Sequence, residues 1–195
     1  MISQQESYWR GDFGDAYVDR NRIDWRLRIP FWRGIIEATK PSWLLEVGCN
    51  IGSNLKAIEA VDHAILARGV DVNEKALWEC QQDNLLVRQM SAKAIGRSYP
   101  GDFDLVFTAG VLIHIPPVEL DEVIDAIIMA SRRYVLAIEY SSDVEQIIQY
   151  RGLDDALWKR PYGDIYSGKG LSLVQDGDAG DGFDNCHYWL FEKQV

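Results

Sequence analysis

The sequence reads Ser42-Trp43-Leu44-Leu45-Glu46-Val47-Gly48-Cys49-Asn50-Ile51-Gly52-Ser53-Asn54-Leu55 at the point that decides its fold. An apolar run ends in the carboxylate Glu46, turns through two glycines and continues with helical spacing. This order predicts a buried strand over residues 43–48, a tight loop and a helix that starts near Ser53. Gly48 and Gly52 supply the backbone freedom that such a loop requires. The stretch therefore predicts the opening strand-loop-helix unit of an α/β sheet.

Strands and helices alternate along the chain after this unit. Further strands are predicted over residues 64–70, 85–89, 104–108 and 134–138. Helices are predicted between them, one from an Asn73 N-cap to Cys80 and one from Pro116 and Pro117 to Ala130. The strands read as continuous apolar runs, which is typical of parallel strands that helices cover on both faces. The pattern predicts a doubly wound α/β sheet.

The C-terminal end of the chain follows a different pattern. Residues 171–174 and 187–191 read as two strands with no helix between them, and the turn-forming residues 176–182 separate them. We expect these two strands to pair antiparallel. The predicted fold class is therefore α/β, with a Rossmann-like, doubly wound, mostly parallel seven-stranded sheet and a C-terminal antiparallel hairpin.

The N-terminal segment is rich in aromatic, glycine and charged residues and contains no leader-like apolar stretch. Residues 26–39 read as mostly helical, with Pro30 as the start of the helix or a kink in it. We expect one domain over residues 1–195, with residues 1–40 as an N-terminal helical cap.

Composition narrows the class of protein. The net charge is −10, from 30 acidic and 20 basic residues, so a nucleic-acid partner, which requires a basic face, is disfavoured. A local arginine cluster over residues 20–33 leaves room for an anionic small molecule. No apolar run reaches the roughly 18 residues of a membrane span. The cysteines Cys49, Cys80 and Cys186 lack CxxC spacing, so we expect a cytoplasmic protein without a metal site.

Two carboxylates end neighbouring predicted strands, Glu46 on the first and Asp71 on the second. Asp71 is placed to accept both hydroxyls of a ribose. A pair of acids suits a cofactor with a ribose and an amino-acid tail better than a pyrophosphate, which favours S-adenosylmethionine (SAM) over NAD. The dinucleotide pattern GxGxxG also fails, because Asn50 and Ser53 occupy its second and third glycine positions. The cofactor-binding candidates are Tyr17, Glu46, Gly48, Cys49, Asn50, Gly52, Asp71, Val72, Ser91, Thr108, Ala109 and Gly110.

Each of these features also has a purely structural interpretation. The glycine loop fits an ordinary strand-to-helix turn, and Asp71 fits a charge that stabilises a helix N-terminus. His114 follows a central strand, where a histidine can act as a general base near neutral pH. A histidine packed under the same loop is the alternative for His114. Trp9 and Tyr17 fit either a cover over the cofactor or a hydrophobic clasp.

The glycine loop, Asp71, the loop over residues 108–115 and the terminal antiparallel pair together resemble class I SAM-dependent methyltransferases. Nearly the whole chain also resembles a narrower group, the methylases associated with pseudaminic acid biosynthesis. The motifs that carry this second resemblance lie at residues 9–17, 20–21, 107–115, 137–140, 150–152 and 157–160. The resemblance implies the class I methyltransferase fold, SAM as cofactor and a sugar or nucleotide sugar as one class of acceptor.

The implied activity is transfer of a methyl group from SAM to an O or N atom of a polar small molecule. We take His114, Glu139 and Tyr140 as catalytic candidates, and Tyr150, Arg151, Lys159 and Arg160 as substrate-binding candidates. Arg151 and Lys159 suit a carboxylate or phosphate on the acceptor. An exposed insertion with solvated charges is the other interpretation of residues 139–166. A non-catalytic SAM-binding module, a nucleic-acid methyltransferase and an NAD(P)-dependent oxidoreductase remain alternatives.

Overall fold

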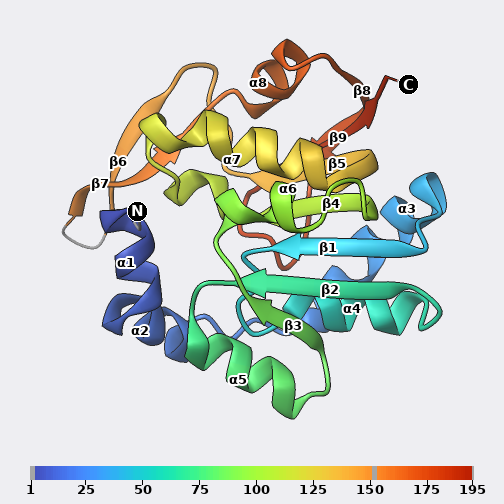
Figure 1. Ribbon diagram of the computed structural model, residues 1–195, viewed down its shortest axis with the longest axis horizontal. Helices are drawn as coiled ribbons and strands as arrows, with labels where there is room; N and C mark the ends of the chain where they lie inside the picture. The colour runs from blue at the N-terminus through green and yellow to red at the C-terminus, as the bar shows by residue number, and fades with distance from the viewer. Residues whose placement is uncertain (1–2, 151–152, 195) are drawn as a thin grey trace.

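A seven-stranded sheet forms the centre of the molecule, as Figure 1 shows for the computed structural model, which describes residues 3–150 and 153–194. Its strands are β1 (Trp43–Val47), β2 (Leu66–Asp71), β3 (Leu86–Gln89), β4 (Phe103–Ala109), β5 (Ser131–Glu139), β8 (Leu171–Asp178) and β9 (His187–Lys193). Their order across the sheet is β3-β2-β1-β4-β5-β9-β8. Strands β1 to β5 are parallel, whereas β9 runs antiparallel to both β5 and β8. The predicted fold class is confirmed.

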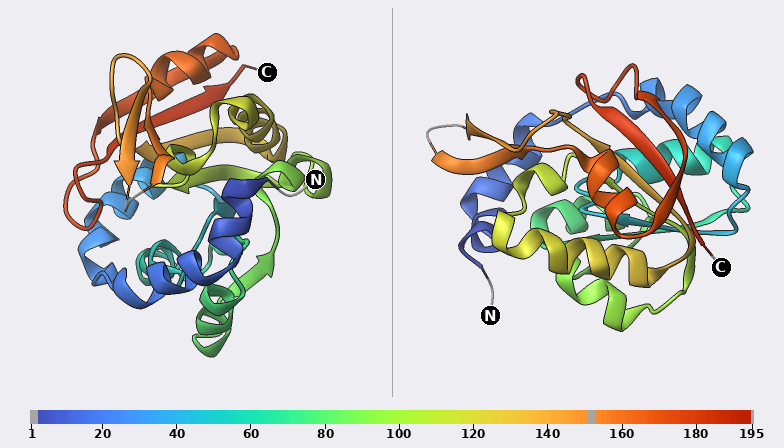
Figure 2. Two further views of the ribbon diagram at one scale, coloured as in Figure 1. Left: turned by 90° about the vertical axis from the view of Figure 1, so that its left-hand side faces the viewer. Right: turned by 90° about the horizontal axis from the view of Figure 1, so that it is seen from above.

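Alternate residues of the central strands face opposite layers, because successive side chains of a strand point to opposite faces. Leu45 and Val106 pack with the helices on one face, and Leu44 and Leu105 pack with those on the other. The helices of the first face are α6 (Ile95–Ser98), α7 (Pro117–Ala130) and α8 (Tyr162–Gly168). Those of the second face are α3 (Ile29–Thr39) and α4 (Ser53–Val61). Figure 2 shows α7 and α3 on opposite sides of the sheet.

Local sequence signals explain where several helices begin. Asn73 caps α5 (Glu74–Gln82), because its side-chain oxygen accepts a hydrogen bond from the Ala76 backbone N–H at 2.8 Å. Pro30 occupies the first turn of α3, and a 3₁₀ turn η1 (Trp25–Arg28) precedes it, so the proline starts the helix rather than kinking it. Two further 3₁₀ turns are η2 (Ala92–Ala94) and η3 (Leu112–His114).

Some elements were not expected from the sequence. A separate two-stranded sheet contains β6 (Gln146–Tyr150) and β7 (Leu153–Lys159), and α8 follows it. Two acidic residues interrupt the apolar pattern of β7, so the sequence did not indicate a strand there. The N-terminal segment, for which a helical cap was expected, forms α1 (Gln4–Arg10) and α2 (Asp12–Arg20), which lie beside the sheet's carboxyl edge (Figures 1 and 2). The second strand begins at Leu66, two residues after its predicted start.

Within the described parts of the chain, no helix is both long enough and apolar enough to cross a lipid bilayer.

Candidate active site

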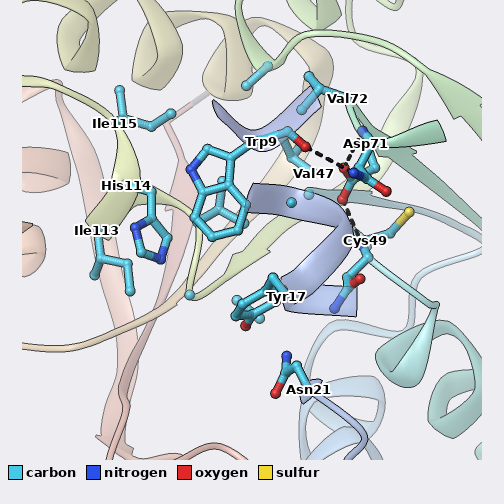
Figure 3. A pocket seen from close by; sticks show the side chains of 18 of the residues that line it. Trp9, Tyr17, Asn21, Val47, Cys49, Asp71, Val72, Ile113, His114 and Ile115 are labelled. Carbon is cyan, nitrogen blue, oxygen red and sulfur yellow. Dashed lines mark hydrogen bonds between the residues drawn. The ribbon is translucent and has the colours of Figure 1, made fainter. Parts of the chain in front are cut away.

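A cavity of about 550 Å³ lies beyond the carboxyl ends of β1, β2 and β4, which is where α/β sheets commonly bind ligands. The loops after these strands form its floor, and α1, α2 and the β6–β7 hairpin contribute side chains to its walls. Figure 3 shows Trp9 and Tyr17 of the two N-terminal helices facing the loop residues across this space. Segments from both ends of the chain therefore enclose one volume.

The loop after β1 is held in an unusual backbone conformation by Asp71. Gly48 and Asn50 both have positive φ, at 75° and 45°. A Cβ at Gly48 would meet Val111 Cγ2 at 2.4 Å, so a side chain there would collide with the next loop. The Asn50 N–H donates to Asp71 Oδ2 at 2.8 Å, and the Asn73 N–H donates to Asp71 Oδ1 at 2.9 Å. Burial raises the pKa of Asp71, which these two hydrogen bonds partly oppose.

Glu46 has one carboxylate oxygen bonded and the other unused. Its Oε1 accepts from Asn54 Nδ2 at 2.6 Å, whereas Oε2 is buried and has no hydrogen-bond partner in the described structure. Asn54 Oδ1 in turn accepts from Arg28 Nη1 at 3.0 Å and from Trp32 Nε1 at 3.1 Å. Burial raises the pKa of Glu46 to about 8. A buried acceptor without a donor is rare in native proteins, which points to a ligand at Oε2.

Aromatic rings form one wall of the cavity. The centroid of the Trp9 ring lies 4.5 Å from that of His114 and 5.2 Å from that of Tyr17. The Tyr150 ring lies 5.4 Å from the His114 ring on the hairpin side. Figure 3 shows the Trp9 indole and the His114 imidazole side by side. His114, which is 8% exposed, packs under the loop and also lines the cavity, and its role as a general base stays a prediction.

Cationic side chains reach the cavity from different elements. Lys159 Nζ lies 5.6 Å from the centre of the Tyr140 ring, and among the described residues no carboxylate pairs with it. Arg28 donates to the Gly182 carbonyl at 2.9 Å, and its Cζ atom lies 4.5 Å from the centre of the Phe183 ring. Burial lowers the pKa of Arg28, although Glu46 opposes this effect. The cavity lining therefore includes cations as well as acidic residues such as Glu46 and Asp71.

Hydrogen bonds fix the N-terminal helices over the cavity. Ser91 Oγ donates to Glu6 Oε2 at 2.8 Å. Asn73 Nδ2 donates to the Trp9 carbonyl at 3.0 Å and to Asp15 Oδ1 at 2.8 Å. The cap of α5 thus also fastens α1 and α2 beside the Asp71 loop. This contact gives the aromatic residues of the N-terminus a defined place at the site.

Most of the predicted site residues meet at this cavity. Its lining includes Tyr17, Glu46, Gly48, Cys49, Asn50, Asp71, Val72, Ser91, Ala109, Gly110, His114, Tyr140, Tyr150 and Lys159. Arg151 lies outside the described residues. The remaining four candidates are Gly52, Thr108, Glu139 and Arg160, and none of them lines the cavity.

Gly52 and Thr108 have packing roles instead of the cofactor contacts predicted for them. Gly52 has φ 75°, and a Cβ there would meet Leu85 Cδ1 at 2.3 Å, so its glycine permits close packing beneath the loop. Thr108 lies within β4 and is completely buried. Its side chain points into the protein interior because residues of a strand alternate between faces.

Glu139 and Arg160 do not reach the cavity as the predicted catalytic and substrate-binding residues. Glu139 is completely buried and accepts hydrogen bonds from backbone N–H groups of the loop after β4. Arg160 is 1% exposed and donates to the carbonyls of Leu112 and Ile115, both at 2.9 Å. Because their polar atoms are bonded to the backbone and, for Arg160 Nε, to Glu145, neither side chain is directed at a ligand.

Sequence reasoning missed Arg28, Asn54 and Glu6 as residues of the site. Arg28 belongs to the arginine cluster that suggested an anionic ligand, but nothing in its spacing distinguishes it from its neighbours. Asn54 opens the helix after the glycine loop, a position whose side chain often points toward the loop. No sequence signal identifies Glu6, because its contact with Ser91 joins residues distant in the chain.

No protein-family model matches the sequence, and no curated protein matches it. The structure is similar to a solved Burkholderia thailandensis 1,6-didemethyltoxoflavin-N1-methyltransferase with bound 1,6-didemethyltoxoflavin and S-adenosylhomocysteine (SAH). That match has a TM-score of 0.78 and 14% identity over 100% of this chain and 91% of the other. A Synechocystis PCC 6803 magnesium protoporphyrin IX methyltransferase with bound SAH matches with TM-score 0.71 and 16% identity, over 97% and 98% of the two chains.

A SAM-dependent methyltransferase from Archaeoglobus fulgidus matches with TM-score 0.68 and 14% identity, over 93% of this chain and 100% of the other. At these identities the likeness concerns the fold, and the narrower resemblance to pseudaminic acid-associated methylases stays a prediction. The chain has the fold of the class I SAM-dependent methyltransferases.

Proposed function

We propose that the protein binds SAM in this cavity and transfers its methyl group to an O or N atom of a polar small molecule. The observation that carries the proposal is the buried, unpartnered Oε2 of Glu46 beside the positive-φ loop. An ammonium group bound there would supply the missing donor and offset the burial of the carboxylate. The methionyl part of SAM carries such an ammonium group.

The residues around Glu46 fit the remaining groups of SAM. Each oxygen of Asp71 accepts one backbone hydrogen bond and keeps a further lone pair for a ribose hydroxyl. Arg28, next to Glu46 through Asn54, suits the methionyl carboxylate. Val72 and Ser91, after β2 and β3, line the cavity at positions suited to the adenine. The same cavity thus offers partners to both ends of the cofactor.

SAM supplies an electrophilic methyl group on its sulfonium, and in-line positioning of the acceptor provides much of the acceleration in such a displacement. We propose that His114 removes the proton from the acceptor atom. Burial raises the pKa of Tyr140, so this phenol stays protonated and can donate a hydrogen bond to the acceptor. Glu139 takes no proton in this scheme, because its carboxylate binds the backbone of the loop.

We further propose an acidic acceptor of the sugar or nucleotide-sugar type. Lys159 lacks an acidic partner among the described residues and faces the cavity beside Tyr140, so it suits a carboxylate or phosphate on the acceptor. The aromatic wall formed by Trp9, His114 and Tyr150 suits a ring packed against it.

Isothermal titration of the protein with SAM and SAH tests the cofactor, and absence of binding at millimolar ligand would refute the proposal. A screen of acidic and neutral sugars with methyl-labelled SAM tests the acceptor. The assignment is supported if an acidic sugar takes up methyl label and if the Lys159→Met variant transfers less label to it. Label confined to neutral molecules contradicts the acidic part alone.

SAH affinity should depend on pH through Glu46. The pKa of Glu46 is about 8 without ligand, so the carboxyl is mostly protonated at pH 6 and cannot accept an ammonium in its neutral form. Affinity should therefore rise between pH 6 and pH 8, by up to about tenfold per pH unit. Calorimetric titration at pH 6, 7 and 8 measures this slope. A Glu46→Gln variant should bind weakly with a flat profile, and an equal slope in both proteins contradicts the assignment.

His114→Ala should reduce turnover by about 10²- to 10⁴-fold, the range usual for loss of a general base. SAH affinity should change little, since the imidazole faces the acceptor side of the site. Initial rates with the acceptor found in the screen give the first quantity, and calorimetry gives the second. His63→Ala, at an exposed residue before β2, is the matched control. Full activity of His114→Ala would remove this residue as the base.

A further inference from the structure

The turn that carries His114 has backbone groups that its own short helix cannot satisfy. In η3, the His114 N–H donates to the Val111 carbonyl at 2.9 Å, and the Ile115 N–H donates to the Leu112 carbonyl at 3.1 Å. The N–H groups of Val111, Leu112 and Ile113 precede these bonds and have no acceptor within the turn. Leu112 and Ile113 are buried, so water cannot accept hydrogen bonds from their N–H groups.

Glu139 accepts hydrogen bonds from all three of these N–H groups. Its Oε1 lies 3.1 Å from the backbone nitrogens of both Val111 and Leu112, and its Oε2 lies 3.4 Å from that of Ile113. The side chain comes from the end of β5, the strand next to β4, and is completely buried. One carboxylate thus holds the amide side of the turn from a neighbouring strand.

Arg160 binds the carbonyl side of the same turn. Its Nη1 donates to the Leu112 carbonyl and its Nη2 to the Ile115 carbonyl, both at 2.9 Å. Its Nε donates to Glu145 Oε2 at 2.6 Å, so the guanidinium has a carboxylate partner of its own. Leu112 is therefore held at its N–H by Glu139 and at its carbonyl by Arg160. We call Glu139 and Arg160 together the turn clamp.

The turn clamp also connects His114 to the acceptor side of the cavity. Arg160 directly follows β7, and Leu157 and Lys159 of that strand line the cavity. Tyr150, at the end of β6, lies against His114 with ring centroids 5.4 Å apart. A displacement of the hairpin would therefore move both a ring in contact with His114 and the guanidinium that holds its turn.

We propose that Glu139 and Arg160 are positioning residues that fix His114 against Trp9 and Tyr150 and align it with the β6–β7 hairpin. The catalytic meaning of this alignment rests on the proposed function, because it is there that His114 serves as the base. The clamp itself is a property of the free protein. Its geometry can therefore be tested without cofactor or acceptor.

Glu139→Gln is the first test, with His114 observed by NMR. Burial raises the pKa of Glu139 to about 7, so a neutral side chain fits this position and the variant should fold. The glutamine has one acceptor oxygen, and its NH₂ group faces N–H donors. Amide exchange at Leu112 and Ile113 should accelerate about 10- to 100-fold, as expected when a charge-assisted hydrogen bond is lost. The His114 imidazole signal should lose its ring-current shift and approach that of exposed His63.

Arg160→Lys tests the other side of the turn, since lysine keeps the charge but lacks the planar guanidinium that reaches both carbonyls and Glu145 at once. It should move the same imidazole signal. Glu192→Gln and Arg133→Lys are matched controls, because these two residues form an exposed ion pair on the sheet at 2.7 Å. Both controls should leave the His114 signal and the Leu112 amide unchanged. SAH affinity should match wild type in all four variants.

Unchanged Leu112 exchange and an unchanged His114 signal in both clamp variants would overturn the proposal. Equal shifts in the controls would do so as well, since they would reflect general destabilisation. If Glu139→Gln does not fold, Arg160→Lys decides the question by the same signals. Failure of the wild-type protein to bind SAH refutes the proposed function and leaves the NMR result on the clamp to be judged separately.

Discussion

Replacing Asp71 with alanine should lower SAH affinity by at least about 100-fold. Two ribose hydroxyls would each lose a hydrogen bond to a charged acceptor, a contribution of about 1.5–3 kcal/mol per bond. The Asn50 and Asn73 N–H groups would lose their acceptor as well, so the loop would no longer be held in its positive-φ conformation. Calorimetric titration of the folded variant with SAH measures the loss.

Asp71→Asn separates these two effects. The asparagine keeps one acceptor oxygen, so one of the Asn50 and Asn73 N–H groups keeps its partner, and ribose binding should weaken less than in Asp71→Ala. Asp83→Asn, at the exposed end of α5 where Asp83 pairs with Lys56, is the matched control and should bind SAH as wild type does. Wild-type affinity in Asp71→Ala would exclude Asp71 from the cofactor site.

Replacing Trp32 with alanine should reduce the free energy of unfolding by about 3–5 kcal/mol, the range for loss of a buried tryptophan ring. Trp32 is completely buried, and its ring centroid lies 4.5 Å from that of Phe107, so it joins α3 to the sheet. Chemical denaturation followed by far-ultraviolet circular dichroism measures this loss. Trp78→Ala is the control, because Trp78 is 59% exposed and its removal should change stability little.

Trp32→Phe tests a second role of the same residue. It keeps most of the ring but removes the Nε1 donor to Asn54, which costs about 1 kcal/mol of stability. Asn54 orients Glu46, so SAH affinity should also fall in this variant. A stable Trp32→Phe protein with unchanged affinity would show that Asn54 orients Glu46 without help from the indole.

Three carboxylates lie at or beside strand ends on the same edge of the sheet, with Glu46 and Glu139 buried and Asp71 half-buried, and each has different surroundings. Glu46 lines the cavity and has one buried oxygen without a partner, Asp71 lines the cavity and binds the loop backbone with both oxygens, and Glu139 gives both oxygens to the His114 turn. All three have a pKa raised mainly by burial. A raised pKa alone therefore does not distinguish a ligand-binding acid from one that supports the backbone.

The sequence by itself determined the sheet. Continuous apolar runs required strands buried on both faces, and their alternation with helices required parallel order, so Glu46, Asp71, Glu139 and the His114 turn had to meet at one edge. The paired acids and the glycine loop followed from local chemistry. These features depend on residues close together in the chain.

Only the tertiary structure decided which of these polar groups face the cavity. Arg160 reads as a binding residue in the sequence, yet its donors meet carbonyls 45 and 48 residues away. Arg28 gives no local signal, yet it meets Asn54 26 residues later. Such hydrogen bonds are fixed by how the sheet, the hairpin and the N-terminal helices pack. A buried polar side chain forms hydrogen bonds with the groups that tertiary packing places beside it, and the local sequence does not specify those groups.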